Sequence, residues 1–392
     1  MTVIEGRISG ERVTEVHLDG GRIAEVLTHQ PSRSEQRGPH DELRIAPGFI
    51  DVQVNGFAGI DFNSPEFQGD DLVEACRRLV ETGVTVFCPT LITASFKHLA
   101  RNIKEIREAC NKHPLVRSMV LGIHLEGPYI SAEDGPRGAH PKAHVVHPDW
   151  QQFENLLELG QGLVRMVTLA PELPGGLAFI KKAAQRGLAV GIGHCSPQPE
   201  VVDQAVRAGA GISTHLGNAA HQLLDRNQNY LQKQMAHDGL MASLICDGIH
   251  LPDYFVKNAV RAKGRANVIL ITDATAATAA PPGRYGLGDL AVEADDEGAL
   301  RLAGTPFLSG STLTMEKAIG NCADFAGIPL TSAIKMATVN PARLFGGISG
   351  KLETGQRADL VLFNSHRKKI KIHQVYLAGR RVYTAEEETQ ER

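Results

Sequence analysis

The chain is poor in cysteine and has no paired cysteine motif. Its 392 residues include six cysteines, and no two of them are spaced as Cys-x-x-Cys. This scatter argues against a disulfide framework and against a structural zinc knuckle. We therefore expect all six cysteines to be reduced thiols.

Long apolar runs are also missing. None reaches the roughly 18 residues that a membrane-spanning helix needs. The first residues, Met1-Thr2-Val3-Ile4-Glu5-Gly6, lack the basic and apolar regions of a signal peptide. These absences predict a cytoplasmic protein with no membrane partner.

The sequence has no excess of either charge. It contains 41 Lys and Arg against 44 Asp and Glu, giving a net charge of −3. Without a basic field, a nucleic-acid partner is not expected, and the substrate should be a small molecule. With 42% hydrophobic residues, the chain is long enough for one large and one smaller domain.

What the sequence does contain is a series of eight short apolar runs, each ending in a polar residue or close to one. Stretches that could form helices follow these runs, and strands alternating with helices predict a parallel sheet. The expected strands are Ala46–Asn55, Val84–Thr90, Met119–Glu126, Val164–Ala170, Leu188–His194, Gly211–His215, Met241–Asp247 and Val268–Asp273. Helical apolar spacing occurs in Asp70–Thr82, Ser95–Cys110, Gly176–Arg186, Pro199–Ala208 and Thr314–Ala326.

These elements predict an α/β fold, a (β/α)₈ TIM barrel over residues 47–347. Both ends of the chain instead contain short alternating segments separated by turns. We expect residues 1–46 and 348–392 to fold together as one small β-sandwich domain. Three long loops, Gly127–Trp150, Leu216–Leu240 and Ala274–Thr312, should lie at the carboxyl ends of the strands, where such barrels build active sites.

Three predicted strands end in residues that bind metals. Glu126 ends the third strand, and His194 and His215 end the fifth and sixth. One carboxylate and two imidazoles suit a divalent metal ion and leave a position open for water. A single buried histidine would more often be a core residue, but three candidate ligands at three strand ends favour a metal site.

Asp273 ends the last predicted strand. Alone, it could equally cap the next helix. Beside a metal, its carboxylate could take a proton from water and return it to a leaving group, so we predict a catalytic role. His124 should lie one layer deeper than Glu126, as a supporting or core residue.

The order of several motifs resembles the N-acetylglucosamine-6-phosphate deacetylases of the amidohydrolase superfamily. The motifs are Pro-Gly-Phe-Ile-Asp-Val-Gln-Val-Asn-Gly (47–56), His-Leu-Glu-Gly-Pro (124–128), Gly-His (193–194), Thr-His-Leu-x-Asn-Ala (214–219), Asp-Gly-Ile-His (247–250) and Thr-Asp-Ala-Thr (272–275). The resemblance covers nearly the whole barrel. It implies release of acetate from an N-acetylated amino-sugar 6-phosphate.

The resemblance also implies particular residue roles. Many amidohydrolases carry His-x-His on the first strand for a second metal, where this chain has Gln53 and Asn55. We therefore expect one divalent ion per subunit, zinc, or iron or cobalt by ligand type. His140 is expected to contact the acetamide carbonyl. The expected substrate-binding residues are Gln53, Asn218, Ala219, Arg226 and His250, with His250 and Arg226 reaching across a homodimer interface.

The chain departs from the family pattern in the loop that should hold the phosphate. Arg226 stands about where the family has its phosphate arginine, but the Glu-Pro-Gly that usually follows is missing. A phosphate site and a neutral-sugar pocket lined by Asp225 and nearby amides both remain open. So do two other interpretations, another amide hydrolase of the superfamily and a degenerate sugar-binding barrel. The former usually needs a lysine near Thr168, and the latter should have lost a ligand or the base.

Overall fold

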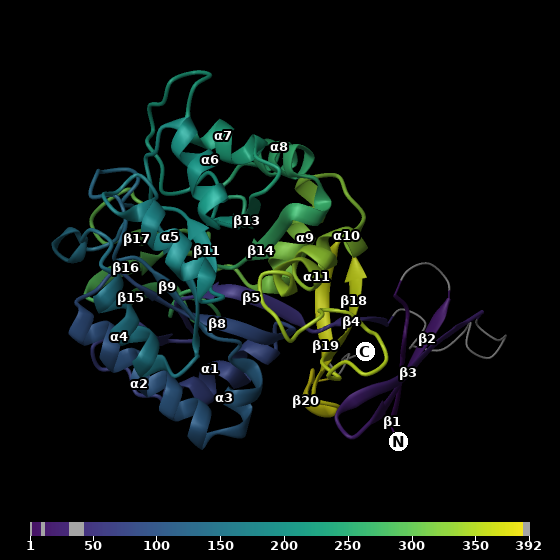
Figure 1. The fold of residues 1–392 in the computed structure, drawn as a ribbon. Helices are drawn as coiled ribbons and strands as arrows, with labels where there is room; N and C mark the ends of the chain where they lie inside the picture. Colours follow the sequence, from purple (N-terminus) through teal and green to yellow (C-terminus); the bar gives the residue numbers. More distant parts are fainter. Residues whose placement is uncertain (1, 9–11, 31–42, 387–392) are drawn as a thin grey trace.

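A parallel barrel forms the centre of the computed structural model, which describes residues 2–8, 12–30 and 43–386 (Figure 1). Its strands are β5 (Phe49–Val54), β8 (Val84–Ile92), β9 (Ile123–Glu126), β10 (Val164–Leu169), β11 (Ala189–Ile192), β12 (Ile212–Ser213), β13 (Met241–Ile245) and β14 (Val268–Ile271), paired in that order. A parallel bridge between Val54 and Ala274 links the first strand to the segment after the last. The predicted (β/α)₈ barrel is confirmed.

Helices surround the barrel, and the longer ones bury an apolar face. They are α1 (Asp71–Val80), α2 (Phe96–Lys112), α3 (Pro114–Met119), α4 (Trp150–Gly160), α5 (Gly176–Gln185), α6 (Pro199–Ala208), α7 (Tyr230–Ala236), α8 (Asp253–Lys263), α9 (Met315–Phe325), α10 (Leu330–Met336) and α11 (Val339–Ala342), with short 3₁₀ turns η2 (Lys142–His144) and η3 (Arg265–Asn267). In α2, Ser95 caps the first turn, and Leu99, Ile103 and Ile106 are buried. All helices predicted from apolar spacing are present. In the described parts of the chain, no helix combines the length and apolarity needed to cross a membrane.

The two ends of the chain meet in a smaller β domain, as predicted. One sheet contains β1 (Thr2–Gly6), β2 (Val13–Asp19) and β3 (Arg22–His29), and the other joins β4 (Arg44–Pro47) to β18 (Leu360–His366), β19 (Lys369–Leu377) and β20 (Arg380–Thr384). Figure 1 shows the purple strands beside the yellow ones. Val16 and Ile23 pack in one cluster with Leu360 and Tyr376, so residues from both ends share a core.

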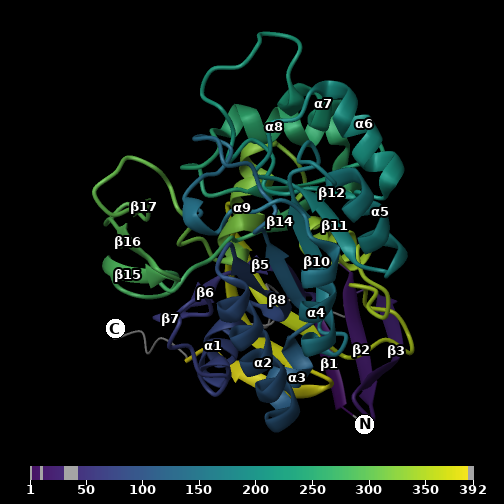
Figure 2. The ribbon, with the colours of Figure 1, turned by 60° about the vertical axis from the view of Figure 1, so that its left-hand side comes forward.

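One long loop contains a sheet that the sequence analysis did not predict. Within 274–312, strands β15 (Gly283–Leu287), β16 (Leu290–Ala294) and β17 (Leu300–Leu302) pair antiparallel. Figure 2 shows this sheet to one side of the barrel, near the short hairpin of β6 (Gly56–Phe57) and β7 (Ile60–Asp61). The Gly288 amide donates to the Asp61 carboxylate at 2.7 Å, which ties the inserted sheet to that hairpin.

Candidate active site

Glu126, His194 and His215 converge at the carboxyl ends of β9, β11 and β12. The Nε2 atoms of His194 and His215 lie 3.1 Å apart, and they lie 3.3 Å and 2.9 Å from Oε1 of Glu126. Ligands bound to a tetrahedral ion at 2.0–2.1 Å would be separated by about 3.4 Å. The three atoms therefore fit one divalent ion.

The protonation of this cluster suits metal binding. Nδ1 of His194 lies 3.1 Å from the carbonyl oxygen of Pro136, to which only a protonated nitrogen can donate. A proton on Nδ1 leaves Nε2, which faces the other two residues, as the ring nitrogen of His194 that can bind a metal. Burial raises the pKa of Glu126, but the hydrogen bonds and charges of His194 and His215 outweigh it and hold that pKa well below its usual value. The carboxylate is therefore ionised.

The backbone at these residues is strained. His194, His215 and Asp273 each lie two residues past the end of a strand, with φ of 50°, 33° and 53°. Residues other than glycine rarely adopt this left-handed backbone conformation. It costs on the order of 1–3 kcal/mol and persists only where the surrounding structure enforces it. At His215, the amide donates to the Ser243 hydroxyl at 2.8 Å. Strain of this kind clusters at functional sites.

Two glycines before His194 make room for its neighbours. A Cβ at Gly191 would lie 2.5 Å from the Thr214 hydroxyl, and one at Gly193 would lie 2.9 Å from Cβ of Thr214. The Gly-Ile-Gly-His sequence thus lets adjacent strands approach closely at the site. This is the physical meaning of that motif here.

Asp273 lies in the same site, held by two amides. Its Oδ1 accepts from Nδ2 of Asn55 at 2.7 Å and from Nε2 of Gln53 at 3.0 Å. The same Gln53 nitrogen donates to Oε1 of Glu126 at 2.9 Å, so Gln53 links the expected base to an expected ligand. Burial and the charge of Glu126 raise the pKa of Asp273 to about 6, a value suited to proton transfer near neutral pH.

His140 reaches the site from the long loop after β9. Its ring centroid lies 4.1 Å from that of His194, and its Nε2 lies 4.0 Å from Oε2 of Glu126. One ligand atom each from Glu126, His140 and His194 fits within 4.8 Å, so His140 is also within reach of an ion. The shorter His215 distance to Glu126 favours His215 as the third ligand. Burial and His194 lower the pKa of His140 well below its usual value, so its ring is neutral.

Comparisons with known proteins agree with this geometry. The model of the amidohydrolase family matches residues 44–382. The chain belongs to the amidohydrolase family. It is 34% identical to the N-acetylglucosamine-6-phosphate deacetylase of Bos taurus (95% of this chain, 92% of the relative) and 32% identical to that of Bacillus subtilis (89% and 88%). The Mycobacterium smegmatis N-acetyl-D-glucosamine-6-phosphate deacetylase, solved with N-acetyl-D-glucosamine-6-phosphate, superposes with a TM-score of 0.87 at 30% identity, covering 97% of this chain and 98% of that one.

Other predicted substrate residues of this amidohydrolase border the site. Ala219 lies across Gly138 from His194, since a Cβ at Gly138 would be 3.7 Å from Cβ of Ala219 and 3.3 Å from the His194 ring. Asn218 has a buried side-chain nitrogen without a hydrogen-bond partner in the described structure, so a ligand could accept from it. His250 follows β13, and its Nδ1 lies 2.6 Å from Oδ2 of Asp247, which fixes the ring.

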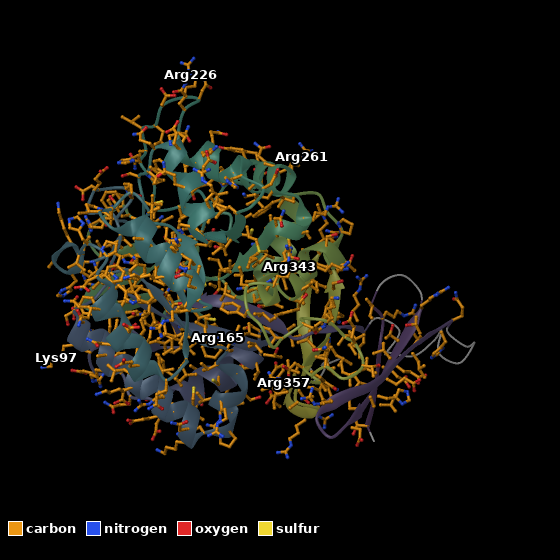
Figure 3. All side chains as sticks on the ribbon, viewed as in Figure 1. Lys97, Arg165, Arg226, Arg261, Arg343 and Arg357 are labelled. Carbon is orange, nitrogen blue, oxygen red and sulfur yellow. The ribbon has the colours of Figure 1, made fainter. Side chains whose placement is uncertain are left out.

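Arg226 is the one predicted site residue that the structure does not bring to the others. It is exposed on the loop between β12 and α7, and Figure 3 shows it at the tip of that loop, far from the barrel. At the same tip, Asp225 accepts from the amides of Asn227 and Gln228 at 3.0 and 2.7 Å, which shapes the turn.

Below the site, His124, expected as a supporting or core residue, belongs to a buried polar network. Its Nε2 lies 2.8 Å from the Thr168 hydroxyl, which lies 2.8 Å from the Thr214 hydroxyl. Burial lowers the pKa of His124 to about 4, so it remains neutral. Thr168 is a buried residue of β10. The network therefore supplies hydroxyl groups and no second charged ligand.

Sequence reasoning missed the contacts that orient the site. Two of these are hydrogen bonds between residues far apart in the chain. The Asn55 side-chain amide donates to Asp273, and Nδ1 of His194 donates to the carbonyl oxygen of Pro136. Gln53 and Asn55 stood out as replacements for histidines, but their hydrogen bonds were not predicted. Only the period-two alternation of an extended segment over residues 53–55, which places Gln53 and Asn55 on one face, could have indicated them.

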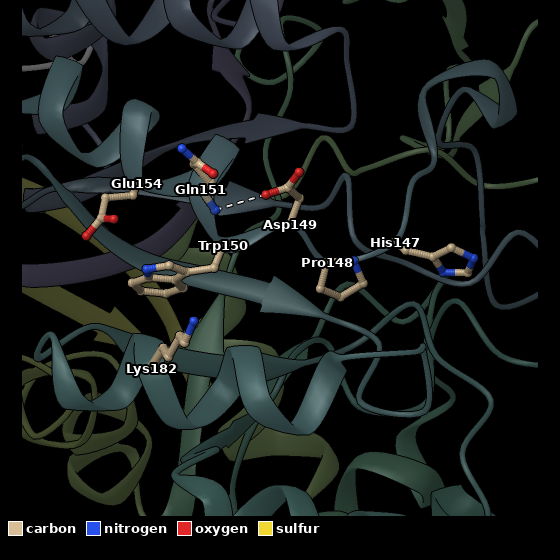
Figure 4. Close-up of a pocket in the computed structure, with 7 residues that line it drawn as sticks. All are labelled: His147, Pro148, Asp149, Trp150, Gln151, Glu154 and Lys182. Carbon is tan, nitrogen blue, oxygen red and sulfur yellow. Dashed lines mark hydrogen bonds between the residues drawn. The ribbon is translucent and has the colours of Figure 1, made fainter.

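A separate hollow of about 700 Å³ opens beside the start of α4 (Figure 4). None of the candidate site residues lines it. Its Asp149 carboxylate accepts from the amides of Gln151 and Gln152, and Lys182 lies over the Trp150 ring at 5.6 Å. These side chains stabilise the helix start, and we assign the hollow no role in catalysis.

Proposed function

We propose that the protein hydrolyses the acetamide of N-acetylglucosamine-6-phosphate to glucosamine-6-phosphate and acetate. The observation that carries this proposal is the position of Asp273, held by two amides beside the convergent Glu126, His194 and His215. Deacetylase relatives that match nearly the full chain support the same substrate.

In this proposal, Glu126, His194 and His215 hold one divalent metal ion, which we assign as zinc from the nitrogen and oxygen ligand set. When bound, such an ion would polarise the acetamide carbonyl and lower the pKa of a water molecule. Oδ1 of Asp273 is occupied by Gln53 and Asn55, which leaves Oδ2 to take the proton of the attacking water and pass it to the sugar amine. The Nε2 of His140 donates to the carbonyl oxygen as negative charge develops there.

We further propose a homodimer in which Arg226 reaches the site of the partner subunit. Arg226 is exposed and has no partner among the described residues, so its guanidinium is available to bind a phosphate through its planar fork. Exposed apolar side chains support an interface on the side that carries Arg226. They lie on the loops and helices that follow β12, β13 and β14. These are Leu223 (92% exposed), Ile249, Tyr254 and Phe307. His250, Asn218 and Ala219 complete the sugar site.

A cytoplasmic location also belongs to this proposal. The six cysteines are all free and buried in the described structure. Reduced cysteines are typical of the cytoplasm, where thiols are kept reduced.

A neutral N-acetylated amino sugar, or another epimer, is the second candidate substrate. The distance of Arg226 from the site of its own chain, together with the missing Glu-Pro-Gly, favours this candidate. Another amide hydrolase of the superfamily is less well supported. Gln53, Asn55 and Thr168 do not offer the ligands that a two-metal site would need.

Acetate release tests the proposal directly. Zinc-loaded protein would be given N-acetylglucosamine-6-phosphate, the galacto epimer and unphosphorylated N-acetylglucosamine in parallel. We expect the highest kcat/KM on the first. Equal rates on the neutral sugar would move the assignment to the second candidate, and no acetate from any of them would contradict a deacetylase.

A further inference from the structure

The ring of His140 is held by one residue through two contacts. Thr93 follows strand β8 directly, and its hydroxyl oxygen lies 2.8 Å from Nδ1 of His140. The backbone N–H of Thr93 donates to the same nitrogen, with an N···N distance of 3.4 Å. Both side chains are buried, at 1% and 5% exposure, so water cannot easily replace these contacts.

These contacts determine which ring nitrogen carries the proton. A backbone N–H can only donate, so the atom that it faces must offer a lone pair. Nδ1 of His140 is therefore the acceptor, and the hydroxyl of Thr93 donates to it as well. A proton on Nδ1 would place two N–H groups face to face. The proton of the neutral ring must then sit on Nε2, the nitrogen that faces Glu126.

We infer that Thr93 is a positioning residue that selects the tautomer of His140 in which Nε2 is the donor. The inference rests on the proposed function, in which that donor faces the acetamide oxygen. The other tautomer would turn a lone pair toward the same oxygen and repel its developing charge. Selecting the tautomer before substrate binds means that the donor need not reorganise during the reaction.

The sequence around Glu126 leaves space for this hydroxyl. A Cβ at Gly127 would lie 2.2 Å from Oγ1 of Thr93, closer than atoms can approach. Gly127 also has φ of +86°, a conformation that suits glycine. The glycine that follows Glu126 thus leaves the space that Thr93 needs, and it connects the expected metal ligand with the expected oxyanion donor.

A pair of variants tests the inference. Thr93→Val keeps the shape and removes the hydroxyl, while Thr93→Ser keeps the hydroxyl. We expect T93V to lower kcat by about 10- to 100-fold, less than the loss of a whole oxyanion donor, because the backbone N–H remains. KM and bound metal should stay near wild type, and T93S should remain within about 3-fold of the wild-type kcat, since it retains the donor.

The tautomer can be measured without substrate. Nitrogen-15 NMR of histidine-labelled, zinc-loaded protein, with the His140 signals assigned through a His140→Gln variant, should show the proton on Nε2 in the wild type and in T93S. Protonated Nδ1 in the wild type would overturn the inference even if T93V fails to fold. Equal kcat in T93V and T93S would also overturn it. Failure of the wild type to release acetate would contradict the proposed function but leave the tautomer result valid.

Discussion

Glu126 and Arg226 are both expected to serve the same substrate, yet the chain holds them in opposite ways. Glu126 ends a central strand, is 2% exposed and lies within hydrogen-bond distance of His215 and Gln53. Arg226 is exposed at the tip of a loop and forms no hydrogen bond or ion pair with the other described residues. The comparison teaches that the barrel positions the residues proposed for the chemistry, whereas the residue proposed for the phosphate lies on an exposed loop that its own chain does not hold at the site.

The largest effect should come from removing a ligand at the strand ends. His194→Ala or His215→Ala should lose the bound metal and lower kcat/KM by at least about 1,000-fold. The reason is that a bound metal stabilises the transition state by several kcal/mol. Metal content and acetate release would be measured together. His147→Ala, a change of an exposed histidine, is the control. Full activity with no bound metal would contradict the proposal that these buried histidines hold a metal needed for the reaction.

The next effect should come from the base. Asp273→Asn should keep its metal and lower kcat by about 100- to 10,000-fold, the usual contribution of a general acid or base. The measurement is kcat of the variant, taken on protein that contains one metal ion per subunit. An unchanged kcat in the variant would exclude Asp273 as the proton carrier.

A smaller and selective effect is expected at the exposed side. Arg226→Ala should lower kcat/KM for the phosphorylated sugar roughly 10- to 100-fold, the size of a hydrogen bond to a charged group, and leave the neutral sugar unaffected. Stability should not change, since the side chain is exposed. Arg261→Ala, another exposed arginine that Figure 3 labels on α8, is the control. Equal losses on both sugars would contradict a phosphate role.

Mixed dimers sharpen the same prediction. A subunit with Asp273→Asn still has Arg226, and a subunit with Arg226→Ala still has its base. If the arginine serves the partner subunit, mixing the two variants should restore about one working site per mixed dimer. No recovery in mixed dimers would place the arginine in its own subunit or outside the site.

The smallest effect should come from the contact between the two loops. Nε2 of His221, in the Arg226 loop, lies 2.9 Å from Glu133, in the loop that carries His140. His221→Ala should raise KM up to about 5-fold with kcat unchanged, because a partly exposed pair contributes at most about 1 kcal/mol. His237→Ala, at the other end of α7, is the control. A fall in kcat without a change in KM would mean that His221 acts on the chemistry instead.

The buried strand-end residues were also easier to predict from the sequence than the exposed loop. Strand-end residues such as Glu126 and His194 follow apolar runs whose direction and end are set by local pattern, and α6 was predicted with its observed bounds. The sheet β15–β17 was missed because its strands are short and flanked by glycines. Contacts such as Asn55 on Asp273, 218 positions apart, depend on closure of the barrel, which no local pattern encodes.

That closure has a consequence for the order in which the enzyme becomes competent. A growing chain that has reached residue 272 already contains Glu126, His194 and His215, together with the two amides that await the base. Only the next residue supplies Asp273, whose own backbone amide bonds to the carbonyl oxygen of Gln53 at 3.1 Å as the first and last strands meet. A fragment that ends before residue 273 lacks the proposed base, so acetate release would report that the ring is complete.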